Sequence, residues 1–248
     1  MTSDYAQQFN FGAGSLWGLR TDIANATPVS FGTLQDVSLE FSGDTKMLYG
    51  QNQYAIALAR GKTKVDLKAK FAQIRGALFN NIYFGGTPTA TQTLVAENEA
   101  ATAVAETYTV ANSAHFLNDL GVTYAATGIP LTYTASASPA VQGTYTQSAG
   151  VYKLAVADAT AAVLTSYTYS TVAGTQIILN NQRMGVTPVF QATFEEVFDG
   201  RQAVFTFNNC VAGKLSMPTK QDDFTINEID FAVSANAAGV IGTINFAL

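Results

Sequence analysis

Reactive side chains are scarce in this chain of 248 residues. With one cysteine, Cys210, the chain can form neither an internal disulfide nor a thiolate metal cluster. With one histidine, His115, it has little for a histidine-ligated metal site or a Ser-His-Asp triad. Phosphate-binding loops and the HExxH, CxxC, GxSxG and EF-hand motifs are all missing from the sequence. We therefore expect no enzymatic activity, no metal and no cofactor.

Charges and long apolar runs are scarce as well. Only 12% of the residues are charged, whereas an average soluble domain has about 25%. The net charge of −5 argues against strong binding to DNA phosphates. The longest apolar runs, such as Tyr54–Ala59, have about six residues, and a membrane-spanning helix needs roughly 20. The start of the sequence does not look like a secretory signal. We expect a chain that stays in the cytoplasm where it is made and does not insert into a membrane.

The few charges are unevenly distributed along the chain. Only six lie between Gly85 and Gln182, and the rest of the chain holds the remaining 25. The low-charge stretch is rich in Ala, Thr, Ser and Tyr, and it begins with a linker rich in glycine and threonine. This distribution predicts a discontinuous domain, 1–84 with 183–248, interrupted by a small inserted β-sandwich domain at 85–182.

Alternation of apolar and polar residues predicts strands in the discontinuous domain. The strictest alternation is in Lys62–Phe71, whose polar face carries four charged residues: Lys64, Asp66, Lys68 and Lys70. The other predicted strands are Thr33–Ser42, Tyr54–Arg60, Thr187–Phe198, Gln202–Asn208, Asp223–Ser234 and Ile241–Phe246. In the insert, strands are predicted at 107–110, 115–117, 131–134, 143–146, 151–156 and 162–169.

Turns and one helix connect these strands. Gly61 predicts a short hairpin turn between Tyr54–Arg60, which is apolar on both faces and expected to be covered on both sides, and the next strand. Asp199-Gly200 predicts a second hairpin, and a change of parity near Asn227 predicts a β-bulge. Apolar residues spaced three and four apart predict a helix over Gln73–Phe84, ended by glycine and packed on the sheet.

The charged residues do not assemble into an evident active site. Adjacent carboxylates such as Glu195-Glu196 point to opposite faces of a strand. The basic residues between Arg60 and Arg75 favour a solvated or inter-subunit strand face over a nucleic-acid site. Two alternatives stay open: a glycan-binding module that uses the tyrosines of the insert, and a glycan-cleaving enzyme whose carboxylates converge from different strands. The large uncharged surface favours self-assembly.

Five stretches of the sequence carry a family resemblance: Phe31–Ser42, Tyr54–Phe71, Gly76–Gly85, Lys214–Phe231 and Gly239–Leu248. Together they resemble the major tail tube proteins of bacteriophages with long, non-contractile tails. The resemblance covers roughly 31–84 and 183–248. The stretch 107–169 resembles the Ig-like modules attached to phage structural proteins.

The resemblance implies a mainly β fold, a β-sandwich or partial barrel with one flanking α-helix, with the Ig-like insert on the tube exterior. It implies a structural virion protein of the phage tail, assembled in the bacterial cytoplasm. Six copies would form a ring, and the rings would stack around a tape measure protein and meet tail terminator and distal tail proteins. DNA would pass through the tube transiently. An N-terminal arm (about Thr2–Ser15) and a loop (about Gly43–Gln53) would join the rings, with these loop candidates: Asp44, Lys46, Leu48 and Tyr49.

A conduit for DNA needs a wall that repels phosphate. The candidates for such a wall, on polar strand faces, are Asp36, Glu40, Asp66, Glu195 and Asp230. Lysines on the same wall would retard DNA. We therefore predict that Lys64, Lys68 and Lys70 face a neighbouring subunit or are neutralised there by acidic side chains.

Overall fold

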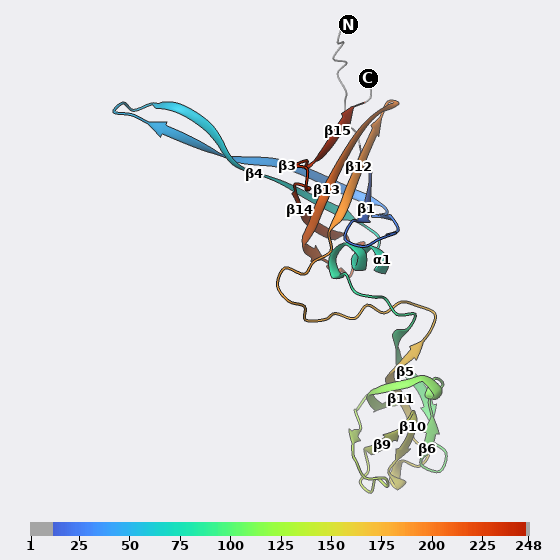
Figure 1. Cartoon of the computed structure of the whole chain (residues 1–248). Coiled ribbons are helices and arrows are strands. Elements are labelled where there is room, and N and C mark those ends of the chain that lie inside the picture. The colour runs from blue at the N-terminus through green and yellow to red at the C-terminus, as the bar shows by residue number, and fades with distance from the viewer. Residues whose placement is uncertain (1–11, 247–248) are drawn as a thin grey trace. The chain divides into compact units, whose positions relative to one another are not determined.

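The protein is described from a computed structural model, which covers residues 12–246 (Figure 1). The chain is mainly β and divides into two compact units. One unit combines Met1–Thr87 with Ile177–Leu248, and we call it the split unit. The other unit is Pro88–Gln176, which we call the insert. Its ends lie slightly inside the expected 85–182.

The split unit is built on one eight-stranded sheet in the order β2-β1-β12-β13-β14-β4-β3, with β15 also paired to β13. All of its strand pairs are antiparallel. The strands are β1 (Ser15–Arg20), β2 (Val29–Ser30), β3 (Leu34–Tyr49), β4 (Ala55–Phe71), β12 (Phe190–Phe198), β13 (Arg201–Ser216), β14 (Asn227–Ser234) and β15 (Gly242–Phe246).

A short helical segment covers the apolar face of this sheet. It consists of α1 (Gly76–Phe79) and a π-helical turn, η1 (Asn80–Phe84). Leu78 and Ile82 are 1% exposed and belong to one core with the phenylalanines of β4, β12, β13 and β14. The predicted helix is thus shorter than expected, because Arg75 is still extended and Ile74 remains 66% exposed. Gly85 ends it in the left-handed conformation, as predicted.

The predicted turn at Gly61 is wrong. β4 runs without interruption from Ala55 to Phe71, and the backbone at Gly61 stays outside the left-handed region. β3 continues past the predicted strand end to Tyr49, so most of the predicted loop Gly43–Gln53 is strand. The physical reason is that each strand supplies the other with a hydrogen-bonding partner along its whole length. A bulge near Gly43 absorbs the extra residues of β4.

The strands in the last third of the chain follow the predicted alternation of apolar and polar residues, with two corrections. β14 begins at Asn227, and Phe224 lies before it, 84% exposed, so the parity change marks the start of the strand and not a bulge. β13 extends to Ser216, well beyond the predicted end at Asn208, because it pairs with β15 and then with β14 along one edge. The Asp199-Gly200 turn joins β12 to β13 as predicted, with φ of 51° and 75°.

The insert contains two sheets that share one core. The four-stranded sheet has the order β6-β10-β9-β8 and the three-stranded sheet the order β5-β11-β7. Its elements are β5 (Gln92–Thr102), β6 (Thr107–Thr109), η2 (Ser113–His115), β7 (Phe116–Tyr124), β8 (Thr132–Tyr133), β9 (Thr144–Ser148), β10 (Val151–Leu154), η3 (Val156–Asp158) and β11 (Ala162–Thr171). β5 was missed by the sequence patterns, which predicted no strand between the linker and residue 107, and β7 is longer than predicted.

The chain enters and leaves the insert at one point. Thr89 and Gln176 form an isolated antiparallel bridge with backbone N···O distances of 3.1 and 3.0 Å. The ends of the insert are therefore held side by side.

Candidate self-assembly surfaces

One face of the split unit's sheet carries a charge network across four adjacent strands. Lys70 contacts Asp36 on β3, with Nζ 3.0 Å from Oδ2, and Lys64 contacts Asp66 on its own strand at 2.6 Å. Further ion pairs link β4, β14 and β13: Lys68–Glu228 at 3.4 Å, Lys68–Asp230 at 3.8 Å, Lys214–Glu228 at 2.6 Å and Lys214–Asp230 at 3.8 Å. The register explains the pairing, because Asp36 lies opposite Lys70 and Asp230 lies opposite Lys68.

The network brings together residues that the sequence assigned to two different roles. Four of the acidic wall candidates and all three inter-subunit lysines lie on this one face. The fifth, Glu195, is on β12, where Gln202 donates a hydrogen bond to its carboxylate. The lysines thus find acidic partners within their own chain. With Lys214 and Glu228 included, the face has four lysines and five carboxylates, a net charge of −1.

Lys214 and Glu228 were not among the sequence candidates. Lys214 reaches the polar face because a bulge at Gly213 shifts the parity of β13 after the buried Ala212. The hydrogen bond from Lys214 holds the pKa of Glu228 below its usual value, and Lys68 acts in the same direction. The hydrogen bonds to Asp66 and Asp36 raise the pKa values of Lys64 and Lys70. These shifts keep Glu228, Lys64 and Lys70 in their charged forms near neutral pH.

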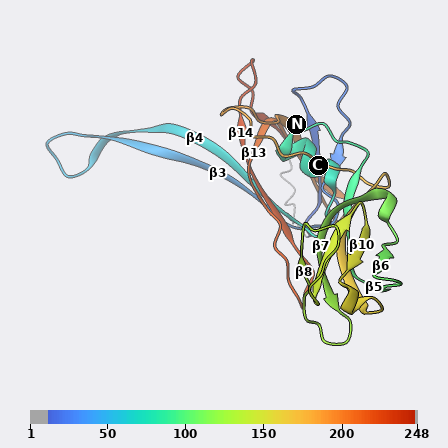
Figure 2. The same cartoon turned by 90° about the horizontal axis from the view of Figure 1, so that it is seen from below.

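The β3–β4 hairpin extends far beyond the rest of the sheet, as Figures 1 and 2 show. β14 pairs with β4 only from Asp66 to Phe71, so among residues 12–246 the remaining part of β4 pairs only with β3. We call the projecting part, residues 43–63, the β-arm. The four predicted ring-stacking residues, Asp44, Lys46, Leu48 and Tyr49, lie on it as strand residues. Of the predicted N-terminal arm, residues 2–11 lie outside the described part of the chain.

Both faces of the β-arm expose apolar side chains, but one of them carries more large ones. That face carries Met47, Ile56 and Leu58, which are 53%, 72% and 68% exposed. The other face carries Leu48, 62% exposed, beside its pairing partner Ala57, and Lys46 beside Ala59. The expectation that this strand is covered on both sides is wrong for the single chain. Contiguous exposed apolar residues of this kind mark an interaction surface.

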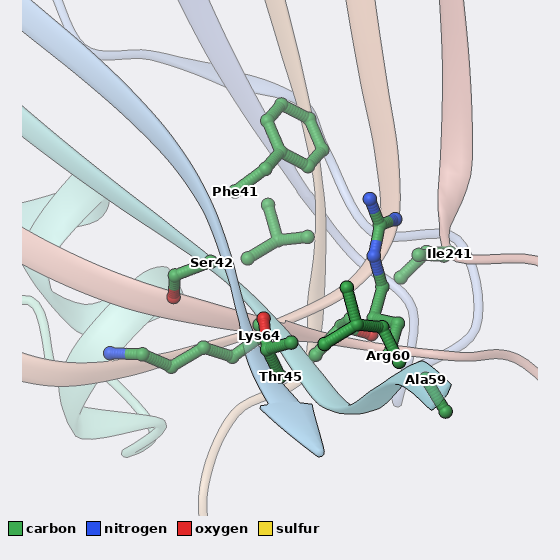
Figure 3. Close-up of a pocket in the computed structure, with 11 residues that line it drawn as sticks. Phe41, Ser42, Thr45, Ala59, Arg60, Lys64 and Ile241 are labelled. Atoms are coloured by element: carbon green, nitrogen blue, oxygen red, sulfur yellow. The ribbon is translucent and has the colours of Figure 1, made fainter. Parts of the chain in front are cut away.

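A groove of about 500 Å³ lies at the root of the β-arm (Figure 3). Its walls include Phe41 from β3, Leu58 and Arg60 from β4, and Ile241 from the segment before β15. In Figure 3 the Arg60 side chain lies beside Ile241, whereas Lys64 points away from it. We call this the arm-root groove.

In the insert, three carboxylates accept hydrogen bonds from tyrosine hydroxyls. Asp119 accepts hydrogen bonds from the hydroxyls of Tyr145 and Tyr152 at 2.5 and 2.9 Å. Two further carboxylates accept tyrosine hydroxyls: Asp158 from Tyr124 at 2.9 Å and Glu99 from Tyr167 at 2.6 Å. Burial, before all other causes, raises the pKa values of these four tyrosines.

The residues with potential reactivity do not converge. Cys210 is fully buried, and burial raises the pKa of its thiol to about 12, which agrees with an inert thiol. Within residues 12–246, no group of three or more His, Cys, Asp and Glu side chains is arranged to hold a metal ion. Over the same residues, no helix has the length and apolar character needed to cross a membrane. The chain matches no model of a known protein family, and no curated protein shows significant sequence similarity to it.

Proposed function

We propose that this chain is a tail tube subunit of a bacteriophage with a long, non-contractile tail. Copies of it form rings, which stack into a tube around a tape measure protein and conduct DNA into the host. The observation that carries the proposal is the β-arm: a long hairpin that leaves the sheet of its own chain and exposes large apolar side chains along one face. The single chain offers this surface no partner among its described residues, and in the proposed tube a second copy supplies it.

The sheet supports the proposal in two further ways. β3 is an edge strand, with β4 on one side and no paired strand among the described residues on the other. An open edge of 16 residues can continue the sheet into a neighbouring copy. The charge network gives the polar face a net charge of −1 with its lysines paired, so a tube wall made from this face would not retain DNA.

In the proposed tube the insert is an Ig-like module on the exterior. Its small two-sheet architecture and its own core fit this role. The glycan-binding alternative needs an exposed aromatic platform. Tyr108, Tyr145, Tyr152 and Tyr167 are instead buried in that core, and the exposed Tyr133 packs edge-to-face on Tyr145. These observations favour the structural role.

Negative-stain electron microscopy of the purified chain tests the proposal. Rings or tubes of uniform width are expected, and sedimentation velocity should show large species that grow with concentration. A chain that stays monomeric at high concentration in both measurements would contradict the proposed function.

A further inference from the structure

The arm-root groove combines apolar walls with one unpaired positive charge. Phe41, Leu58 and Ile241 are 56%, 68% and 42% exposed, so the walls are open to a partner. Arg60 takes part in none of the ion pairs found among residues 12–246. The groove has a volume of about 500 Å³, which is in the range of pockets that hold a ligand or a few side chains. A groove of this kind fits a short segment that is both apolar and acidic.

The same chain displays such a segment at the turn between β12 and β13. Val197 is 53% exposed there, next to the half-buried Glu196 and the exposed Asp199. Neither carboxylate takes part in an ion pair found among residues 12–246. The Asp199-Gly200 turn, in which both residues hold positive φ, closes the hairpin and places this segment at the end of the β12–β13 pair. Being both acidic and apolar, the segment complements the arm-root groove.

The turn cannot reach the groove of its own chain. Ile241, in the groove, precedes β15, whereas the turn lies beside Ala203, which pairs with Phe246 at the far end of β15. The five residues of β15 thus lie between them, a separation of roughly 17 Å along a strand. Both ends belong to one hydrogen-bonded sheet, so the distance is fixed. This turn can therefore fill such a groove only in another molecule.

We propose that the β12–β13 turn of one copy docks in the arm-root groove of a second copy, with Val197 against the apolar walls and Glu196 or Asp199 beside Arg60. The contact joins two different surfaces and is heterologous, so it propagates into rings or stacks and does not stop at a dimer. This inference rests on the proposed function, because it names the partner surface inside the proposed assembly.

Charge reversal tests the contact. Arg60→Glu and Glu196→Arg/Asp199→Arg should each raise the protein concentration needed for assembly at least about tenfold, because like charges then face each other. Mixing the two variants should restore assembly, because the acidic groove of one meets the basic turn of the other. The matched controls are Arg183→Glu and Asp222→Arg/Asp223→Arg, which change exposed residues elsewhere and should assemble like the wild type.

Cross-linking provides a readout that does not depend on the strength of one ion pair. Thr45→Cys, at the position paired with Arg60, places a thiol in the groove and Val197→Cys places one on the turn, while Cys210 stays buried. A mixture of the two single variants, assembled and then mildly oxidised, should give a disulfide-linked dimer that neither variant gives alone. Thr45→Cys mixed with Val141→Cys, on the surface of the insert, is the control and should give none.

The outcomes separate the two claims. If the wild type assembles but the reversals have no effect and the mixed cysteine variants do not cross-link, the docking inference is wrong and the proposed function stands. If the wild type itself stays monomeric, the proposed function is wrong and the inference falls with it.

Discussion

The two units of this chain use their few charges in opposite ways. The split unit sets lysines against carboxylates on an open sheet face, where water and salt reach them. The insert has one lysine, Lys153, which pairs with Glu106, and no arginine, and three of its carboxylates accept tyrosine hydroxyls at the edge of a closed core. Charge pairs on an exposed face contribute little to the stability of one chain. They suit a surface whose final environment is set by neighbours.

The units also differ in how complete they are. The insert buries its large aromatic residues between two facing sheets. The split unit buries one face of its sheet but leaves the β-arm face with Met47, Ile56 and Leu58 in solvent. The insert thus resembles a finished monomer, and the split unit resembles one part of a larger structure. Trp17, the only tryptophan, is in the split unit, so tryptophan fluorescence follows that unit alone, whereas the tyrosine signal comes mostly from the insert, which holds seven of the 11 tyrosines.

Removal of the β-arm should have the largest effect, because the β-arm is the incomplete surface that distinguishes the split unit from the insert. Replacing residues 44–62 by Asn-Gly keeps the pairing of Gly43 with Thr63 and touches none of the described core residues. We expect assembly to be abolished and the tryptophan-monitored unfolding midpoint to stay near the wild-type value. Ile56→Thr/Leu58→Thr should weaken assembly in the same direction, whereas Ala57→Ser should assemble normally. Tubes formed by the deletion variant would argue against the role of the β-arm.

Alkaline pH should destabilise the insert, with its several buried tyrosines, more than the split unit, where burial raises the pKa of Cys210. Burial raises the pKa values of Tyr108, Tyr145 and Tyr152 above the ordinary value of 10.0. A group whose pKa is higher in the folded state contributes stability that is complete below pH 10 and is lost as the pH rises. Each tyrosine can contribute up to about 1.4 kcal/mol per pH unit. Urea unfolding followed by tyrosine absorbance at pH 9 to 11.5 measures this, and the variant Tyr108→Phe should show a smaller slope.

Loss of Asp119 should have a moderate effect that is confined to the insert. Asp119→Ala leaves the hydroxyls of the buried Tyr145 and Tyr152 without their acceptor, at a cost of about 2 kcal/mol. Urea denaturation at neutral pH should show this loss in the tyrosine signal and not in the tryptophan signal, and tube formation should persist. Tyr133→Phe, at an exposed position, is the control. Equal shifts in both signals would show that the two units unfold together.

Acid should act weakly on the split unit through Glu228. Its pKa is lowered below 4.5 by the hydrogen bond from Lys214, so its contribution is present above that pH and is lost as the pH falls through the lowered value. Glu228→Gln should remove this part of the acid dependence and change the melting temperature at pH 7 only slightly, because the pairs are exposed. Tryptophan-monitored melting between pH 7 and 3 tests it, with Glu97→Gln in the insert as control.

Sequence patterns located most strands of the split unit but not their lengths. Alternation identified Lys62–Phe71 and its two faces because one face is buried. It failed on Tyr54–Arg60, where neither face is buried in the single chain and glycine suggested a turn. The long pairing of β3 with β4 overrode that local signal. The helix was placed by its spacing, but its start was misjudged because Ile74 fits the period without being buried.

The charge network shows a different limit. The lysine row on β4 was visible in the sequence, and so were most of its partners. What the sequence could not supply is the register: only the pairing of β4 with β3 and β14 sets Lys70 by Asp36 and Lys68 by Asp230. Lys214 was missed because a single-residue bulge decides which face it takes. Pairing across distant strands depends on the whole sheet, and local periodicity does not encode it.

The open edge of β3 has a consequence for timing. In the proposed tube, a freshly folded subunit already carries its adhesive strand edge and β-arm, and no rearrangement has to expose them. Control then passes to nucleation: the first few subunits have to meet before each strand edge finds a complementary surface, and growth after that is faster. The charged residues of the β-arm, Arg60 among them, slow random edge-to-edge pairing of free subunits. The same strand edge thus sets both the strength of the polymer and the lag that precedes it.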